Sequence, residues 1–201
     1  MKFILARKER MTQLFDEEGR VHAGTILKAG PVTVTQVKTA ETKDGYAAVQ
    51  VGFEAQTTKR LNKAHHGKPF RVLKEFRVEN PGEVAVGSEV TLEAFAPGDV
   101  VRVSGASKGR GFAGVVKRHG FHGGRRTHGQ KHSEREPGSI GGGGRAGGRV
   151  AKGMRMAGRM GGTRVTVPNL KVLHINKETG EMIVSGAVPG ARGTLVEVVA
   201  A

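Results

Sequence analysis

Apolar and polar residues alternate in short runs over the first 104 residues of the chain. In the clearest run, residues 46–54, every second residue is apolar: Ala47, Val49, Val51 and Phe53. Because side chains along a strand point alternately to opposite faces, this run predicts a half-buried antiparallel strand. The preceding Lys43-Asp44-Gly45 is typical of a hairpin turn, since Asp-Gly tolerates the positive φ that such turns require.

Similar runs predict further strands on both sides of a 60-residue interruption. Before it they cover residues 2–6, 11–15, 21–28, 32–38, 71–78, 89–95 and 100–104. After it they cover residues 165–167, 170–175, 181–185 and 194–199. Short strands separated by turn residues, with little helical periodicity, indicate an all-β fold, either a barrel or a sandwich.

The interruption, residues 105–164, has a composition unlike the rest of the chain. It contains 14 Lys and Arg against two acids, Glu134 and Glu136, and 19 of the chain's 32 glycines. Its net charge of +12 is most of the chain's +15. Because strand-like sequence stands at both ends, we expect a discontinuous β body, residues 1–104 and 165–201, with a mostly irregular basic extension inserted between strands.

This extension has too few large apolar residues to bury a core of its own. Ordering a backbone costs about 1–2 kcal/mol per residue, so the segment needs an external partner with many contacts. Its concentrated positive charge indicates a polyanion, and it has no apolar helical face that could lie on a membrane. Arg and Lys donate charge-assisted hydrogen bonds to phosphates, while glycine lets the backbone approach closely, so we expect the partner to be RNA.

The candidate RNA-binding residues are the basic side chains of the extension and of one loop. In the extension they are Lys108, Arg110, Lys117, Arg118, His119, Arg125, Arg126, His128, Lys131, His132, Arg135, Arg145, Arg149, Lys152, Arg155, Arg159 and Arg164. In the polar loop of residues 56–69 they are Lys59, Arg60 and Lys63. An ordinary exposed loop would explain the second group equally well. Phe112 and Phe121 would either stack on bases or pack where the extension leaves the body.

Two motifs in the extension compete with this interpretation. Residues 109–114 match the G-x-G-x-x-G pattern of dinucleotide-binding proteins, but Gly120, Gly123 and Gly124 interrupt the helix that should follow. His119, His122, His128 and His132 have spacings seen in metal sites. The arginines between them would oppose a cation, so no metal, cofactor or catalytic residue is expected.

Other features of the sequence limit where the protein works. The chain has no cysteine, which is typical of a cytosolic protein and excludes disulfides and thiolate metal sites. No apolar run approaches the roughly 18 residues of a membrane span. A cytoplasmic protein without a membrane partner is therefore expected.

Long motifs distributed along the chain resemble one protein family. They include Gly105-Ala106-Ser107-Lys108-Gly109-Arg110-Gly111-Phe112-Ala113-Gly114, Pro137-Gly138-Ser139-Ile140-Gly141, Lys152-Gly153-Met154-Arg155-Met156-Ala157-Gly158 and Gly186-Ala187-Val188-Pro189-Gly190. In this order they are similar to the bacterial large-subunit ribosomal protein family L-three (uL-three). The similarity covers nearly the whole chain.

The resemblance implies a non-enzymatic structural protein of the ribosome. It implies a β-barrel body of the translation-protein type and a long extension that runs through 23S ribosomal RNA towards the peptidyl-transferase centre. It also implies binding near the 3′ end of that RNA, a role in starting subunit assembly, and L-fourteen and L-nineteen as neighbours, without a homo-oligomer. Gly142 stands where many members carry a methylated glutamine, so that modification is not expected.

A free RNA chaperone or single-strand binder is the alternative from a different class. Such proteins use aromatic side chains on a sheet face to stack on bases. The chain has no Trp and one Tyr, which disfavours this alternative.

Overall fold

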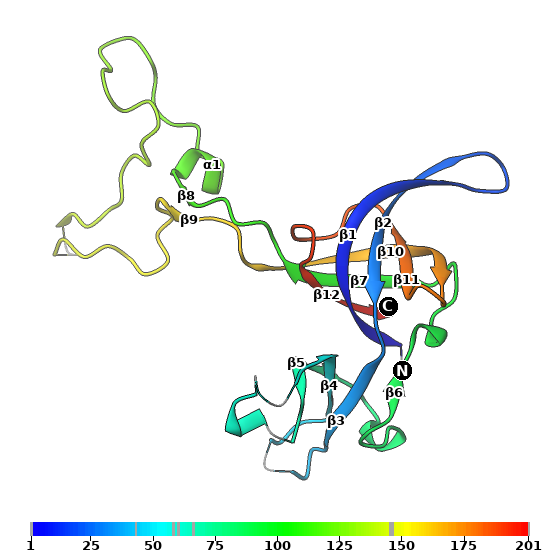
Figure 1. Ribbon diagram of the computed structural model, residues 1–201. Helices are drawn as coiled ribbons and strands as arrows, with labels where there is room; N and C mark the ends of the chain where they lie inside the picture. Colours follow the sequence, from blue (N-terminus) through cyan, green and yellow to red (C-terminus); the bar gives the residue numbers. More distant parts are fainter. Residues whose placement is uncertain are drawn as a thin grey trace. The chain divides into compact units, whose positions relative to one another are not determined.

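The computed structural model describes residues 2–42, 44–57, 59, 61–65, 67–144 and 147–200 (Figure 1). The chain divides into two compact units, residues 1–106 with 164–201 and residues 107–163. We call the first the body and the second the extension. The sequence assigned Gly105, Ala106 and Arg164 to the extension, but they lie in paired strands of the body, with Ala106 opposite Arg164.

The body contains a ring of six antiparallel strands. Its order is β1-β12-β7-β10-β11-β2, so each strand has two hydrogen-bonded neighbours. These strands are β1 (Phe3–Phe15), β2 (Val21–Ala29), β7 (Val100–Ala106), β10 (Arg164–Asn176), β11 (Glu181–Ser185) and β12 (Leu195–Ala200). The expected mostly β fold is confirmed.

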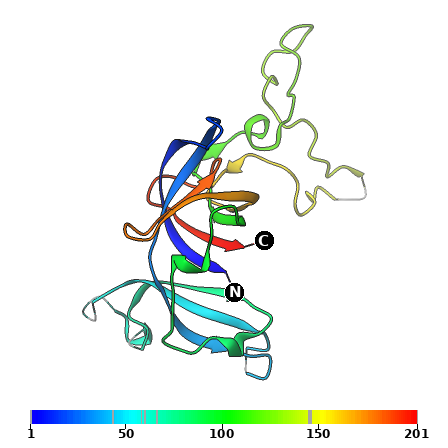
Figure 2. The same ribbon diagram turned by 90° about the vertical axis from the view of Figure 1, so that its right-hand side faces the viewer.

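A second sheet in the body has four strands in the order β5-β4-β3-β6. They are β3 (Val32–Lys38), β4 (Ala48–Ala55), β5 (Phe70–Arg77) and β6 (Glu89–Val90), with the short 3₁₀ helices η2 (Lys63–His65), η3 (Pro81–Glu83) and η4 (Leu92–Ala94) between and after them. Figure 2 shows this sheet continuing from β2 at the end of the ring nearest the N-terminus.

In two places, two strands that the sequence predicted separately form one long strand with a register shift in its pairing. The runs 2–6 and 11–15 join as β1, whose pairing with β2 shifts register between Lys8 and Met11. The runs 165–167 and 170–175 join as β10, whose pairing with β7 shifts between Val167 and Leu170. A proline within this second interval lacks the N–H that a regular ladder needs, which explains the break in the pattern.

The expected strand over residues 89–95 is wrong beyond Val90. The chain instead turns into η4. Leu92 of η4 and Phe95, the residue that follows it, are both buried, and the Phe95 N–H donates to the Leu92 carbonyl at 3.0 Å. Residues three apart share a face of a 3₁₀ turn, so the same two side chains reach the core without a strand.

The predicted strand over residues 46–54 is present as β4, beginning two residues later. Val49, Val51 and Phe53 are buried as expected, but the opposite face is partly covered as well. A Cβ built on Gly52 would lie 2.2 Å from Cδ2 of Phe70, so the ring of Phe70 occupies that space. Lys43 of the predicted turn lies outside the described residues, and Gly45 has the positive φ of 70° that the turn signal indicated.

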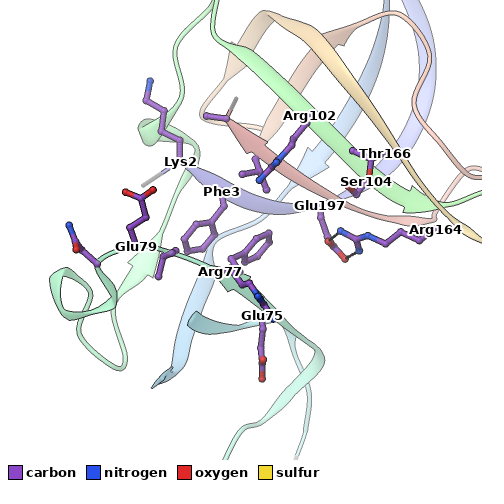
Figure 3. Close-up of a pocket in the computed structure, with 15 residues that line it drawn as sticks. Lys2, Phe3, Glu75, Arg77, Glu79, Arg102, Ser104, Arg164, Thr166 and Glu197 are labelled. Carbon is purple, nitrogen blue, oxygen red and sulfur yellow. Dashed lines mark hydrogen bonds and ion pairs between the residues drawn. The ribbon is translucent and has the colours of Figure 1, made fainter. Parts of the chain in front are cut away.

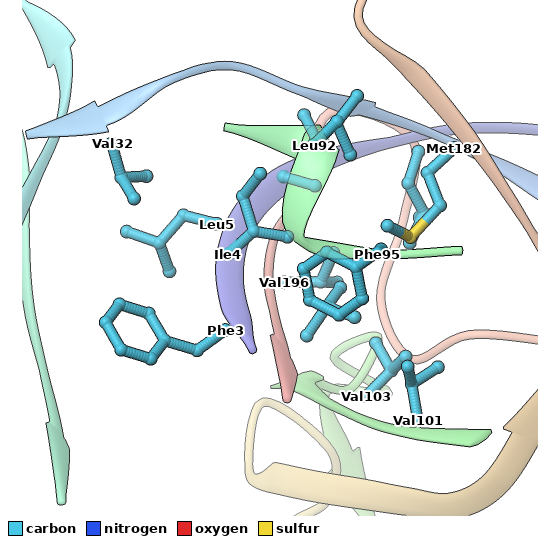
Figure 4. Close-up of a cluster of buried hydrophobic side chains, with 14 of the residues drawn as sticks. Phe3, Ile4, Leu5, Val32, Leu92, Phe95, Val101, Val103, Met182 and Val196 are labelled. Carbon is cyan, nitrogen blue, oxygen red and sulfur yellow. The ribbon is translucent and has the colours of Figure 1, made fainter. Parts of the chain in front are cut away.

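One hydrophobic core extends from the ring into the second sheet. The start of β1 connects the two parts, because Phe3, Ile4 and Leu5 are at most 3% exposed. Figure 4 shows Phe3 and Leu5 on the Val32 side of β1, with Ile4 on the opposite side. A strand buried on both faces reads as a continuous apolar run, as this stretch does.

The extension contains little regular structure. Strand β8 (Phe112–Ala113) pairs with β9 (Gly158–Arg159), and helix α1 (Val115–His119) follows β8. Gly120, with φ of 74°, ends α1 in the left-handed conformation that glycine adopts readily. No helix among the described residues has the length and apolarity needed to cross a membrane.

Candidate nucleic-acid interface

The basic side chains of the extension are mostly exposed. The exposed candidates are Lys108, Arg110, Lys117, Arg125, Arg126, His128, Lys131, His132, Arg135, Arg149, Lys152, Arg155 and Arg159. Arg118 and His119 are partly buried, and Arg145 lies outside the described residues.

Carboxylates neutralise almost none of this charge within the described part of the extension. Only Arg126 has an ion pair there, with Glu134 at 2.6 Å. Nine cationic side chains make no hydrogen bond or ion pair with any described residue: those of Lys108, Arg110, Lys117, Arg125, Lys131, Arg135, Arg149, Lys152 and Arg159. Their charges are therefore available to an external anion.

The two chain segments at the base of the extension are hydrogen-bonded to each other. The Ser107 N–H donates to the Thr163 carbonyl at 2.9 Å. The Arg110 N–H donates to the Met160 carbonyl at 2.8 Å, and the Met160 N–H donates to the Gly111 carbonyl at 2.9 Å. The pairing of β8 with β9 continues this ladder. The base is thus a short hairpin-like stem within the irregular extension.

Two candidate RNA-binding side chains make hydrogen-bond contacts within this stem. Nη1 of Arg118 donates to the Met156 carbonyl at 2.7 Å, and Nε2 of His119 contacts the same oxygen at 3.0 Å. A carbonyl oxygen only accepts hydrogen bonds, so His119 carries its proton on Nε2 in this contact. Their location in the stem gives both residues a structural contact that the sequence pattern did not indicate.

The two phenylalanines of the extension differ in their surroundings. The Phe121 ring lies 4.9 Å from the guanidinium carbon of Arg155 and 6.0 Å from the His119 ring. Phe112 is 78% exposed. Phe121 therefore has cationic and aromatic neighbours within the extension, while Phe112 presents an uncovered ring.

A close crossing of the chain forms a loop farther along the extension. The Gly124 N–H donates to the Glu134 carbonyl at 3.1 Å. A Cβ on Gly123 would lie 1.9 Å from that same oxygen, so only glycine permits the crossing. The loop between these points carries five of the candidates, Arg125, Arg126, His128, Lys131 and His132.

The remaining candidates belong to the body. Arg164 donates from Nη1 and Nη2 to the two carboxylate oxygens of Glu197, at 2.7 and 2.5 Å. Burial raises the pKa of Glu197, but hydrogen bonds from Arg164 and Lys74 outweigh it and hold that pKa below its usual value. Lys59 and Lys63 are exposed, and Arg60 lies outside the described residues.

The competing motifs do not come together as sites in the described residues. No group of three or more His, Asp or Glu side chains there could hold a metal ion. The G-x-G-x-x-G segment, residues 109–114, contains β8 and is followed by the five-residue helix α1. A helix this short is unlike the long one that follows a dinucleotide-binding loop.

An antiparallel β body that fixes both ends of an exposed, basic, glycine-rich insertion fits the class of ribosomal proteins with basic extensions. Comparison with known proteins agrees. The sequence model of the family "Ribosomal protein L3" matches residues 77–187, more than half of the chain.

Relatives match over nearly the full length. The large ribosomal subunit protein uL3 of Acidothermus cellulolyticus is 49% identical, over 98% of this chain and 91% of its own. The uL3 proteins of Thermobifida fusca and Synechococcus sp. (strain RCC307) are 48% and 49% identical, over 98% and 97% of this chain and 93% of each relative. The chain belongs to the ribosomal protein L3 family, whose members are structural, non-enzymatic proteins of the large ribosomal subunit.

Proposed function

We propose that the protein binds 23S ribosomal RNA directly near its 3′ end, helps to start assembly of the large subunit, and directs its extension towards the peptidyl-transferase centre. In this proposal the six-stranded ring is a β-barrel of the translation-protein type, and ribosomal proteins L-fourteen and L-nineteen are neighbours. Membership of the L3 family and the charge of the extension support it.

The observation that carries the proposal is the set of nine unpaired cations described above. Exposed cations without acidic neighbours repel one another, and a phosphate backbone supplies the missing anions at regular spacing. In the body, by contrast, carboxylates such as Glu54 and Glu197 each hold two cations. The extension is therefore the part of the chain whose cationic side chains are available to bind an external polyanion.

The arrangement recognises RNA mainly through its backbone. Guanidinium groups donate paired hydrogen bonds to phosphate oxygens, and the glycines between them let the main chain come within hydrogen-bonding distance. His128 and His132 would add hydrogen bonds to phosphates or stack on unpaired bases, and Phe112 offers an exposed ring for stacking.

Salt dependence of binding to a 23S RNA fragment tests this function. With about ten phosphate contacts, the slope of log K against log salt is expected to be roughly −7 to −9, because each contact releases condensed counterions. A filter-binding or fluorescence titration over several salt concentrations measures it. Affinity that does not change with salt would contradict the proposal.

A charge-matched pair of variants locates the contacts. In Lys131→Gln/Arg135→Gln the slope should become about two units shallower, since each phosphate contact contributes roughly one unit. The control Lys171→Gln/Arg192→Gln removes the same charge from exposed positions of the body. It should leave the slope within about half a unit of the wild-type value.

A further inference from the structure

The body has a cleft that is lined by residues of the body. It lies between the outer face of β12, β7 and β10 and the strand β5 with the segment that follows it, and its volume is about 560 Å³. Figure 3 shows side chains from both sheets facing into it. Phe3 and Phe76, stacked with ring centroids 4.4 Å apart, form its apolar wall.

Most polar groups of the cleft already have partners. Glu197 is held by Arg164 and Lys74, and the Ser104 and Thr166 hydroxyls are hydrogen-bonded to each other at 2.7 Å.

The charged groups at the rim are also largely paired. Lys2 pairs with Asp99 at 2.8 Å, and Glu75 accepts from Lys38 and Tyr46. The guanidinium of Arg77 lies 5.3 Å from the centre of the Tyr46 ring. These contacts fix the walls of the cleft before anything binds there.

Two charged side chains that line the cleft are exceptions. The side chains of Arg102 and Glu79 make no hydrogen bond, ion pair or cation–π contact with any described residue, whereas Arg77 has its contact with the Tyr46 ring. Arg102 follows the buried Val101 on β7, so the strand's alternation directs its side chain outwards into the cleft, as Figure 3 shows. A ligand that satisfies both must offer an anion to Arg102 and a hydrogen-bond donor to Glu79.

We propose that this cleft binds a single ribonucleotide of an RNA strand, with a phosphate at Arg102 and a ribose hydroxyl or base amino group at Glu79. A ribonucleotide carries both kinds of group, a phosphate anion and the hydroxyl or amino donors of its ribose and base. The inference rests on the proposed function and adds to it a contact site on the body.

Titration of the full-length protein with adenosine 5′-monophosphate tests the chemistry, and inorganic phosphate serves as the comparison probe. Amide NMR shifts should appear at residues that line the cleft, such as Thr166 and Val199, and be larger with the nucleotide than with phosphate. Arg102→Gln should weaken nucleotide binding at these amides about tenfold, because it removes a charge-assisted hydrogen bond. Arg192→Gln, an exposed arginine outside the cleft, should leave it unchanged.

The lack of cysteine allows a second test in assembled subunits. A hydroxyl-radical probe attached at Asn80→Cys, on the cleft rim, should cleave ribosomal RNA at a discrete position. The same probe at Thr179→Cys, in the turn between β10 and β11, should not cleave at that position.

Three results would overturn the inference: no cleft shifts with the nucleotide, equal shifts with phosphate alone, or cleavage of a neighbouring protein in place of RNA. Failure of both cysteine variants and of the unmodified chain to enter large subunits would instead contradict the proposed function. The two proposals can thus fail separately.

Discussion

Three glutamates of the body, Glu54, Glu75 and Glu197, each accept hydrogen bonds from more than one side chain. Glu197 is the most enclosed, with its side chain 11% exposed, while its partners Arg164 and Lys74 are 58% and 41% exposed. The Glu197 carboxylate therefore depends on Arg164 and Lys74 for its hydrogen bonds, whereas those two side chains can also hydrogen-bond to water.

Replacing Glu197 with Gln tests this dependence. We expect the free energy of unfolding to fall by about 1–2 kcal/mol, because charge-assisted hydrogen bonds are lost at a largely buried position. Urea denaturation measures it. The control Glu93→Gln breaks an exposed pair with Lys177, whose atoms are 3.8 Å apart, and should change stability by less than about 0.5 kcal/mol. Equal losses in both variants would contradict the expectation.

The same glutamates make stability depend on pH. Hydrogen bonds from Lys38 and Tyr46 lower the pKa of Glu75, and a hydrogen bond from Arg7 lowers the pKa of Glu54. A carboxyl whose pKa falls on folding adds stability above its unfolded pKa, here near 4.5, and this stability is lost as pH falls through the folded pKa.

Urea midpoints should therefore decrease as the pH is lowered from about 5 to 3. In Glu75→Gln the decrease should be smaller, because the contribution of that group is already absent. A wild-type and a variant curve that run parallel over this range would show that Glu75 does not contribute.

At the scale of elements, the stem of the extension is the part with a structure of its own. It combines the β8–β9 ladder, helix α1, and the contacts of Arg118 and His119 with the Met156 carbonyl. Val115 of α1 is 2% exposed, so the helix also buries an apolar side chain. We expect the stem to be ordered before RNA binds.

Replacing Arg118 with Gln should loosen this stem. Amide hydrogen exchange at Arg110 and Met160, whose N–H groups bridge the two segments, should become at least about tenfold faster in the free protein, since roughly 1.5–3 kcal/mol of charge-assisted hydrogen bonding is lost. Lys117→Gln, which alters the exposed neighbour on α1, is the control and should leave exchange unchanged. Exchange that is already unprotected in the wild type would show that the stem is not preformed.

Local patterns were sufficient for most strands and for the location of the basic extension. Alternation located β3 and β4, and the change in charge and glycine content located the insertion. The strand expected through Leu92 and Phe95 was wrong. Over so short a run, apolar residues two apart, as in a strand, cannot be distinguished from apolar residues three apart, as in a 3₁₀ turn. The partners of Arg118 and Glu197 could not be predicted, because they lie 38 and 33 residues away and depend on strand register.

For the whole molecule, the extension is a long loop between two strands that pair with each other. Strand β7 ends at Ala106 and β10 begins at Arg164, and these two residues are opposite one another. Closing a loop costs more entropy as it lengthens, by about 0.6 kcal/mol for each doubling. The body's fold therefore depends little on the presence of the extension.

Deleting residues 109–161 tests this independence. The four residues left between β7 and β10 are Ser107, Lys108, Gly162 and Thr163. We expect the deletion variant to unfold cooperatively, with a free energy of unfolding equal to that of the wild type or up to about 2 kcal/mol higher. Circular dichroism during thermal unfolding measures it, and loss of the cooperative transition would show that the extension is part of the body's core.

The closed order of the ring also bears on how the chain avoids aggregation before it joins the large ribosomal subunit. Among the described strands the ring leaves no unpaired edge, but the second sheet ends at β5, which has no neighbour on its outer side in the order β5-β4-β3-β6. That strand carries three cations, Arg71, Lys74 and Arg77, against one acid, Glu75, so its net charge is positive. A second molecule that added the same strand to this edge would bring like charges together, so the open edge opposes self-association and favours a polyanionic neighbour.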